Sequence, residues 1–146
     1  MKEELISFAH AILAKEKGFD WDVLHTYRDG KLDYEDYYDG YIDELYYNAN
    51  GINRTKFKEI ISAPTQAVLL RWLREKHNID VVISPERYPR GVNYCVQAQK
   101  FDFTADPELF LNFVAKGSGW FNDNNEYDSY EKSLEKGLFE GLKLIK

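Results

Sequence analysis

The side chains that could perform catalysis or hold a transition metal are few and widely spaced. The chain has three histidines, His10, His25 and His77, and no two of them form an HxH or HExxH spacing. Its one cysteine, Cys95, lies in a strand-like stretch, and no sequence feature indicates a base or an oxyanion hole beside it. We therefore interpret Cys95 as a small buried residue, and predict no catalytic residue, no metal site and no cofactor.

A run of acids and tyrosines, "DYEDYYDGYIDE", holds the densest set of oxygen ligands. An EF-hand frame on Gly40 would place Tyr46 at the twelfth position, where calcium binding requires a glutamate, so the frame fails. Tyrosine supplies a large contact area and tolerates exposure, so the run is interpreted as a surface for a partner. The alternative is that its tyrosines pack on the protein's own core. The candidate partner surface comprises Tyr34, Asp36, Tyr37, Tyr38, Asp39, Tyr41 and Asp43.

Basic residues are concentrated later in the chain. Residues 53–90 hold 8 Lys/Arg and 4 Asp/Glu, whereas residues 1–52 hold 5 Lys/Arg and 12 Asp/Glu. Arginines near Trp72 and Tyr88 would suit a nucleic-acid strand, which is held by phosphate contacts and by stacking. For these arginines the alternative is a solvated helix face. The spaced carboxylates suggest a separate function class, a mimic of DNA that occupies a nucleic-acid-binding protein. The candidate nucleic-acid strip comprises Arg71, Arg74, Arg87 and Arg90.

The composition predicts a globular, cytoplasmic protein that does not enter a membrane. The 146 residues fit one domain, or one domain with an added arm, and the 44% apolar fraction argues against disorder as the main state. No apolar run approaches about 18 residues, and charges interrupt the N-terminal stripe where a signal peptide needs a continuous apolar centre. A single cysteine excludes an internal disulfide, which suits the cytoplasm.

Hydrophobic periodicity predicts helices at both ends of the chain. The first has apolar residues at three- and four-residue steps, Leu5, Phe8, Ile12 and Leu13, and Gly18 ends it. For the last helix, Asp128 and Glu131 form a capping box, and Gly137 and Gly141 would let another element approach closely. The inner face of that helix comprises Leu134, Leu138, Leu142 and Ile145.

The middle of the chain predicts a helix followed by two strands. Ser62 caps the helix, Pro64 lies in its first turn, and Asn78 suits the left-handed conformation that ends it. Its inward stripe comprises Val68, Leu69, Trp72 and Leu73. "IDVVI" and "VNYCVQAQKFDF" predict strands, and "SPERYPRG", with two prolines, predicts the loop between them. We expect Trp72 to be buried under this hairpin.

Five further segments complete the pattern. "FDWDVLHTY" predicts a short helical or extended element, and Asp29-Gly30 resembles a hairpin turn. Residues 33–47 predict a helix, although Asp39-Gly40 also resembles a turn. "INRTKFKEIIS" and "PELFLNFVAK" predict short helices, and "WFNDNNEYD" predicts a loop with a short strand at Trp120-Phe121.

Together these elements predict an α+β fold that is mostly helical, with a small antiparallel hairpin or short sheet covered by helices. The predicted organisation is an acidic, tyrosine-rich helical region at residues 1–52 and an α-β-β-α-α core region at residues 53–146, in one compact domain. The order resembles double-stranded-RNA-binding modules loosely, but glutamates balance the lysines of the final helix, which is basic in those modules.

Two segments, "PTQAVLLRWLREKHNIDVVI" and "YDSYEKSLEKGLFEGLKLI", resemble a family of small uncharacterised proteins of phages and Bacteroidetes genomes. That family has a W-L-R-E-x-H helix, a strand pair and a terminal Y-E-x-x-L-x-x-G-L-x-E-x-L-K-L-I helix. The resemblance covers residues 64–146 and implies no reaction and no site. We therefore expect a non-enzymatic accessory protein of phage or mobile-element type that binds a protein partner. A nucleic-acid-binding module and an acidic DNA mimic are the alternatives.

Overall fold

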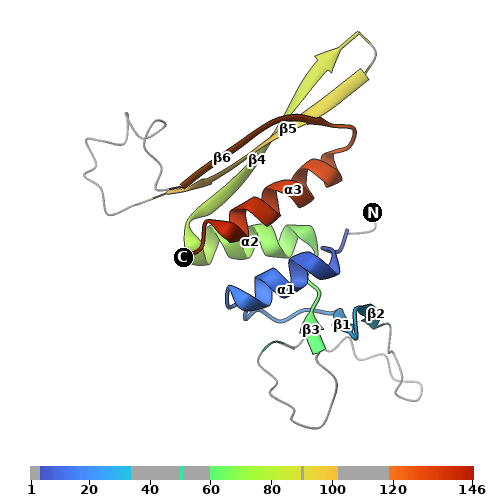
Figure 1. The fold of residues 1–146 in the computed structure, drawn as a ribbon, viewed down its shortest axis with the longest axis vertical. Coiled ribbons are helices and arrows are strands. Elements are labelled where there is room, and N and C mark those ends of the chain that lie inside the picture. The colour runs from blue at the N-terminus through green and yellow to red at the C-terminus, as the bar shows by residue number, and fades with distance from the viewer. Residues whose placement is uncertain (1–3, 34–49, 51–59, 90, 102–118) are drawn as a thin grey trace. The chain divides into compact units, whose positions relative to one another are not determined.

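The computed structural model of the chain describes residues 4–33, 50, 60–89, 91–101 and 119–146. The chain divides into two units, Met1–Val68 and Leu69–Lys146. The first unit contains α1 (Phe8–Glu16), β1 (Thr26–Arg28), β2 (Lys31–Asp33) and β3 (Ile60–Ser62), and α2 (Gln66–His77) crosses the boundary (Figure 1). The second contains β4 (Ile79–Tyr88), β5 (Gly91–Lys100), β6 (Gly119–Tyr127) and α3 (Tyr130–Lys143).

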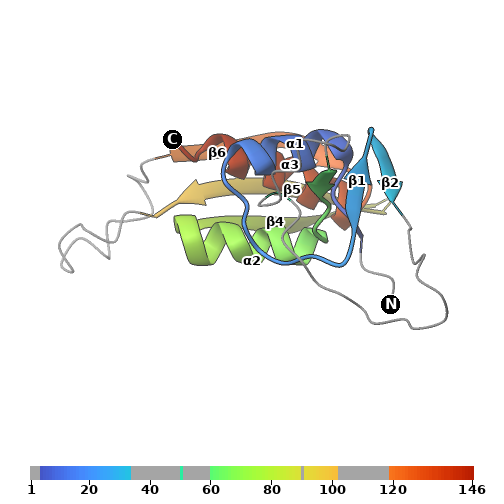
Figure 2. The same ribbon diagram turned by 90° about the horizontal axis from the view of Figure 1, so that it is seen from below.

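The sheet of the first unit has the strand order β2-β1-β3, with both pairs antiparallel. Asp29 and Gly30, with φ of 51° and 76°, form the turn between β1 and β2, so the predicted hairpin turn is confirmed (Figure 2). β3 comes from a segment whose pattern predicted a helix. Ile60 and Ile61 are β-branched and pair with Arg28 and Tyr27, so strand pairing with β1 overrides the local helical spacing.

α1 buries a different face from the predicted one. The helix begins at Phe8, so Leu5 lies before it, and Ile12 is 37% exposed. Ala11 and Ala14 are the buried residues of the helix, because small side chains let a helix lie close to its neighbour. The predicted stop is confirmed, since Gly18 adopts a φ of 84° directly after the helix C-cap.

Asn50 connects two separate parts of the first unit. Its side-chain amide donates to the carbonyl oxygen of Phe19 at 3.0 Å and accepts from the backbone N–H of Ser62 at 3.0 Å. The backbone N–H of Asn50 donates in turn to Ser62 Oγ at 3.3 Å. Ser62 is fully buried, so water cannot replace these bonds without opening the unit.

Asn50→Ala should therefore destabilise the first unit by about 2–4 kcal/mol, because the Ser62 N–H and the Phe19 carbonyl would both lose a partner. Urea unfolding followed by circular dichroism would measure the loss. Ser62→Ala is the matched control, since it removes only the hydroxyl acceptor and should cost less than half as much. Equal midpoints for wild type and Asn50→Ala would contradict the role given to this amide.

The second unit is an antiparallel sheet with α3 packed on one face. The strand order is β4-β5-β6, and the register pairs Val81 with Ala98 and Ile83 with Val96. α3 lies along this sheet (Figure 1). Its predicted inner face is confirmed, because Leu134, Leu138, Leu142 and Ile145 are all buried. α3 begins one residue later than predicted, with Ser129 rather than Asp128 as its N-cap; Ser129 Oγ accepts from the N–H of Lys132.

Two glycines set the distance between α3 and the sheet. A Cβ on Gly137 would lie within 3.0 Å of methyl groups of both Val81 and Val96. A Cβ on Gly141 would lie 3.2 Å from Leu73 of α2 and 3.4 Å from Ile79. The prediction that these glycines permit a close approach is confirmed, and the approaching elements are β4, β5 and α2.

α2 carries the predicted stripe but starts later than predicted. Leu69, Trp72 and Leu73 are buried, and Trp72, at 1% exposure, fulfils its predicted burial. The helix begins at Gln66, so Ser62 belongs to β3, and it is the hydroxyl of Thr65 that accepts from the N–H of Val68. Asn78 ends α2 with a φ of 55°, as predicted.

β4 and β5 are longer than predicted, and the predicted loop "SPERYPRG" is mostly strand. Ten residue pairs join the two strands, up to Tyr88 and Gly91, whereas β6 pairs with β5 only from Tyr94 to Lys100. Residues 86–89 and 91–93 therefore belong to a two-stranded arm that extends past β6 and α3 (Figure 1). We call this segment the arm.

The position of Pro85 explains why a proline does not stop β4. The Phe101 N–H donates to the Asn78 carbonyl, so even-numbered residues of β4 bond to β5 and odd-numbered ones face its outer edge. Pro85 is odd-numbered, and an edge position needs no N–H. Nearby, the outward N–H of Val81 donates to the Oδ1 of Asp80 at 3.1 Å. Two of the edge positions of β4 are therefore closed to a further strand.

The α+β class is confirmed, whereas the mostly helical content is wrong. Two three-stranded sheets hold a share of the chain similar to that of the helices. β6 accounts for part of the difference, since it runs over nine residues where the sequence predicted a strand at Trp120-Phe121 only. The helices predicted at 33–47 and 107–116 lie outside the described residues. No helix within the described ranges is long and apolar enough to cross a bilayer.

Candidate functional site

The three histidines and the cysteine lie in different segments of the fold. Ser7 Oγ and His10 Nδ1 share a hydrogen bond at the start of α1, and the His25 carbonyl accepts from the N–H of Ala63. The His77 ring meets the Trp72 ring edge-on, with centroids 4.4 Å apart. Cys95 is a half-buried residue of β5 and forms no disulfide. Within the part of the chain that the structure describes, no three His, Cys, Asp or Glu residues form a metal-binding group.

The predicted partner surface, Tyr34 to Asp43, lies outside the described residues. Its role in binding therefore stays a prediction. Asn50, which the structure does describe, lies shortly after this segment in the sequence and is bonded to Phe19 and Ser62.

Two arginines of the predicted nucleic-acid strip form ion pairs with acids. Arg71 Nε lies 2.7 Å from Glu75 Oε1, and Arg74 Nη2 lies 2.7 Å from Asp80 Oδ1. Arg74 also donates from Nε to the same Asp80 oxygen at 3.2 Å. These pairs are exposed, so they add little to stability, but each acid offsets the charge that a phosphate would meet.

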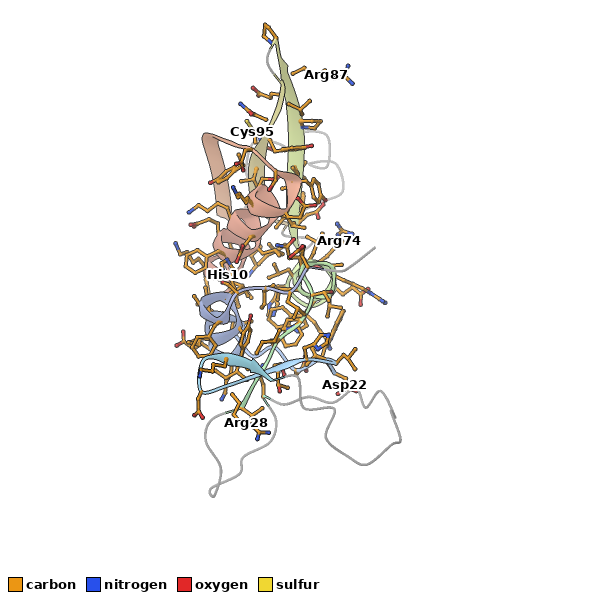
Figure 3. All side chains as sticks on the ribbon, turned by 90° about the vertical axis from the view of Figure 1, so that its right-hand side faces the viewer. His10, Asp22, Arg28, Arg74, Arg87 and Cys95 are labelled. Carbon is orange, nitrogen blue, oxygen red and sulfur yellow. The ribbon has the colours of Figure 1, made fainter. Side chains whose placement is uncertain are left out.

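Arg74, on α2, lies beside the first residues of β4, whereas Arg87 lies close to the last residue of that strand. Arg74 is bonded to the second residue of that strand, and Arg87 lies close to the arm's tip (Figure 3). At the usual rise of about 3.3 Å per residue, the seven steps from Asp80 to Arg87 span about 23 Å. Arg90 lies outside the described residues. The described arginines thus belong to two separate surfaces, on α2 and on the arm.

A different set of residues meets where the arm leaves the body of the second unit. The ring of Tyr130, the first residue of α3, lies edge-on to Tyr94 of β5, with centroids 6.1 Å apart and planes at 86°. Tyr94 shares its sheet face with Val96, which is packed against Gly137 of α3. Val92 and its cross-strand partner Arg87 come next on that face, beyond the start of α3. We call Pro85, Arg87, Val92, Tyr94 and Tyr130 the corner.

The corner is apolar and exposed. Val92 is 42% exposed and Tyr130 is 45% exposed, and Pro85, the cross-strand partner of Tyr94, is also exposed. Large apolar side chains usually gain by burial, so neighbouring exposed ones on a projecting element indicate a contact surface. Arg87 is exposed as well, and among the described residues no acid forms an ion pair with it.

Acidic residues flank the other end of the corner, at the start of α3. Glu131 lies in the first turn and is exposed. Asp128 is paired with Lys132 at 2.8 Å, and the hydrogen bond from Lys132 lowers the pKa of the Asp128 carboxyl. Further along α3, burial alone would raise the pKa of Glu140, but hydrogen bonds from Lys136 and Lys143 outweigh it and lower that pKa. The carboxylates of Asp128 and Glu140 are therefore charged at neutral pH.

The sequence contained a signal for the corner that Pro85 and Pro89 obscured. Pro85, Arg87, Val92 and Tyr94 alternate with polar residues at the spacing of two that strands require. Tyr130 lies far from them in the sequence, and only the packing of α3 on β5 brings it to Tyr94.

Comparison of the chain with protein-family models, with curated protein sequences and with solved structures finds no match. The resemblance of residues 64–146 to small phage and Bacteroidetes proteins therefore stays a prediction. The residues and their geometry carry the functional argument.

Proposed function

We propose that the protein is a non-enzymatic protein-interaction protein, of the accessory type expected for phages and mobile elements, and that it contacts its partner at the corner. The observation that carries the proposal is a pair of exposed apolar residues, Val92 on the projecting arm and Tyr130 at the start of α3. Buried protein–protein contacts are enriched in tyrosine and arginine, and the corner offers two tyrosines and Arg87.

The charge of the second unit favours a protein partner over a nucleic acid. Residues 69–146 hold 11 Lys/Arg and 12 Asp/Glu, so the unit has no excess of positive charge. Glu131 flanks the corner, and a phosphate backbone approaching Arg87 would also approach that carboxylate. Arg71 and Arg74, which would otherwise extend a basic surface, already have acid partners. A nucleic-acid module and a DNA mimic remain the alternatives, with less support.

The acidic, tyrosine-rich segment at 33–47 is proposed as a second contact surface. Its support is compositional, because spaced carboxylates and tyrosines suit a polar or basic partner. The corner is the surface for which the structure gives exposures and contacts, so it is the one to test first.

We expect a photo-crosslinking side chain at position 92 to form covalent adducts with protein upon irradiation. p-Benzoylphenylalanine would replace Val92 in the full chain, expressed in its host. The matched control replaces Val82, which is 48% exposed and lies on the opposite face of the same sheet. Protein adducts at position 92 well above those at position 82 would support the proposal. Equal yields at both positions, or adducts that nuclease removes, would refute it.

A further inference from the structure

The corner combines opposite charges at its two ends with apolar residues between them. Arg87 lies on the arm side, and Glu131 lies at the start of α3. Val92 lies beside Arg87 as its cross-strand partner, and Tyr94 and Tyr130 lie between Arg87 and the start of α3. Val92 and Tyr130 are each more than two-fifths exposed. From this arrangement we infer that the partner at the corner is a second copy of this chain. The inference rests on the proposed function and names its partner.

A two-fold axis through the corner would make the surface complementary to itself. In such an interface, residue i contacts residue j of the other copy, and j contacts i in return. Arg87 would then face Glu131 of the partner subunit, and Glu131 would face the partner subunit's Arg87. Val92 and Tyr130 would bury their exposed apolar surface against the same residues of the other copy, which supplies the main driving force.

Partners of a single charge fit the corner less well. An acidic peptide would be attracted by Arg87 but repelled by Glu131. A basic peptide would be attracted by Glu131 but repelled by Arg87. Like charges brought together at an interface oppose binding, whereas the corner of a second copy pairs both ends at once. Strand addition is a poor alternative, because Pro85 and the bond from Val81 to Asp80 close two positions of the β4 edge.

Charge exchange tests this geometry directly. Sedimentation equilibrium of the full chain, from about 5 to about 200 μM, should show a reversible dimer for wild type. Arg87→Glu alone and Glu131→Arg alone should each weaken the dimer by about tenfold or more, since each places two like-charge pairs in the interface. An equimolar mixture of the two variants should restore dimers, because every contact then joins opposite charges. Arg71→Glu, an equal change on α2, is the matched control and should leave the dimer unchanged.

Each outcome decides between the second copy and another partner. A wild-type chain that stays monomeric throughout this range overturns the inference. So do single variants that dimerise as wild type does, or a mixture that fails to restore dimers. If the chain is monomeric but position 92 still crosslinks to another protein, the proposed function stands and the second copy is wrong. If position 92 forms no protein adduct at all, the proposed function fails together with the inference.

Discussion

Gly137→Ala should destabilise the second unit by about 2–3 kcal/mol, although alanine is the better helix former. Alanine gains about 1 kcal/mol over glycine in a helix interior. The new methyl group, however, would lie within 3.0 Å of both Val81 and Val96, on two different strands. Because the two valines lie on neighbouring strands of the sheet, this steric overlap can be relieved only if α3 moves away from the sheet. Such a movement would expose the leucines that the helix buries.

Gly141→Ala provides the matched control, one turn further along the same helix. Its Cβ would lie 3.2 Å from Leu73 Cδ1 and no closer than 3.4 Å to Ile79. The end of a leucine side chain can move by a few tenths of an ångström. The gain in helix propensity from alanine therefore roughly offsets the cost of crowding against Leu73. Urea unfolding of both variants would separate the cases. A Gly137→Ala midpoint equal to that of Gly141→Ala would show that α3 does not approach the sheet as closely as described.

Trp72→Ala should cost about 3–5 kcal/mol, because it removes the largest fully buried side chain and leaves a cavity. A domain usually has a stability of about 5–15 kcal/mol, so much of the variant should be molten or insoluble. The tryptophan also holds the edge-on contact with His77 at the end of α2. Trp72→Phe, which retains most of the volume, should lose much less stability.

Thermal melts followed by circular dichroism would check this expectation, with His77→Ala as a second comparison. That variant removes the ring contact but keeps the tryptophan in place, and aromatic pairs are worth about 0.5–1.5 kcal/mol beyond their area. A Trp72→Ala protein that melts within a degree or two of wild type would place the indole in solvent. The central helix would then be a candidate contact surface in its own right.

The local features of the fold could be predicted from the sequence. Asn78 and Asp29-Gly30 adopt the positive φ that their residue types favour, and the leucines of α3 follow helical spacing into the core. Trp72 is buried because it shares a stripe with Leu69 and Leu73. Each of these features depends on neighbours within a few residues, which a sequence pattern records.

Features that depend on distant pairing could not be predicted in the same way. β6 contains Asn122, Asp123, Asn124 and Asn125, which have low strand propensity, and its pairing with β5 decides its conformation. The prolines of "SPERYPRG" predicted a loop, because the sequence does not show which edge of a strand will face outward. The corner depends on such distant contacts, because it requires both the paired strands of the arm and a helix, α3, that begins beside them.

The closed edge of β4 also bears on how the chain behaves when it is concentrated. Fibrils grow when an exposed strand offers an unbroken row of N–H and C=O groups to an incoming strand. In β4 that row is interrupted at Val81, whose N–H is already bonded to Asp80, and again at Pro85, which has no N–H. An incoming strand would leave unmatched carbonyl groups at both points, at a cost in free energy at each step of growth. This edge of the sheet is thus a poor template for amyloid, even though the strand is long and rich in β-branched residues.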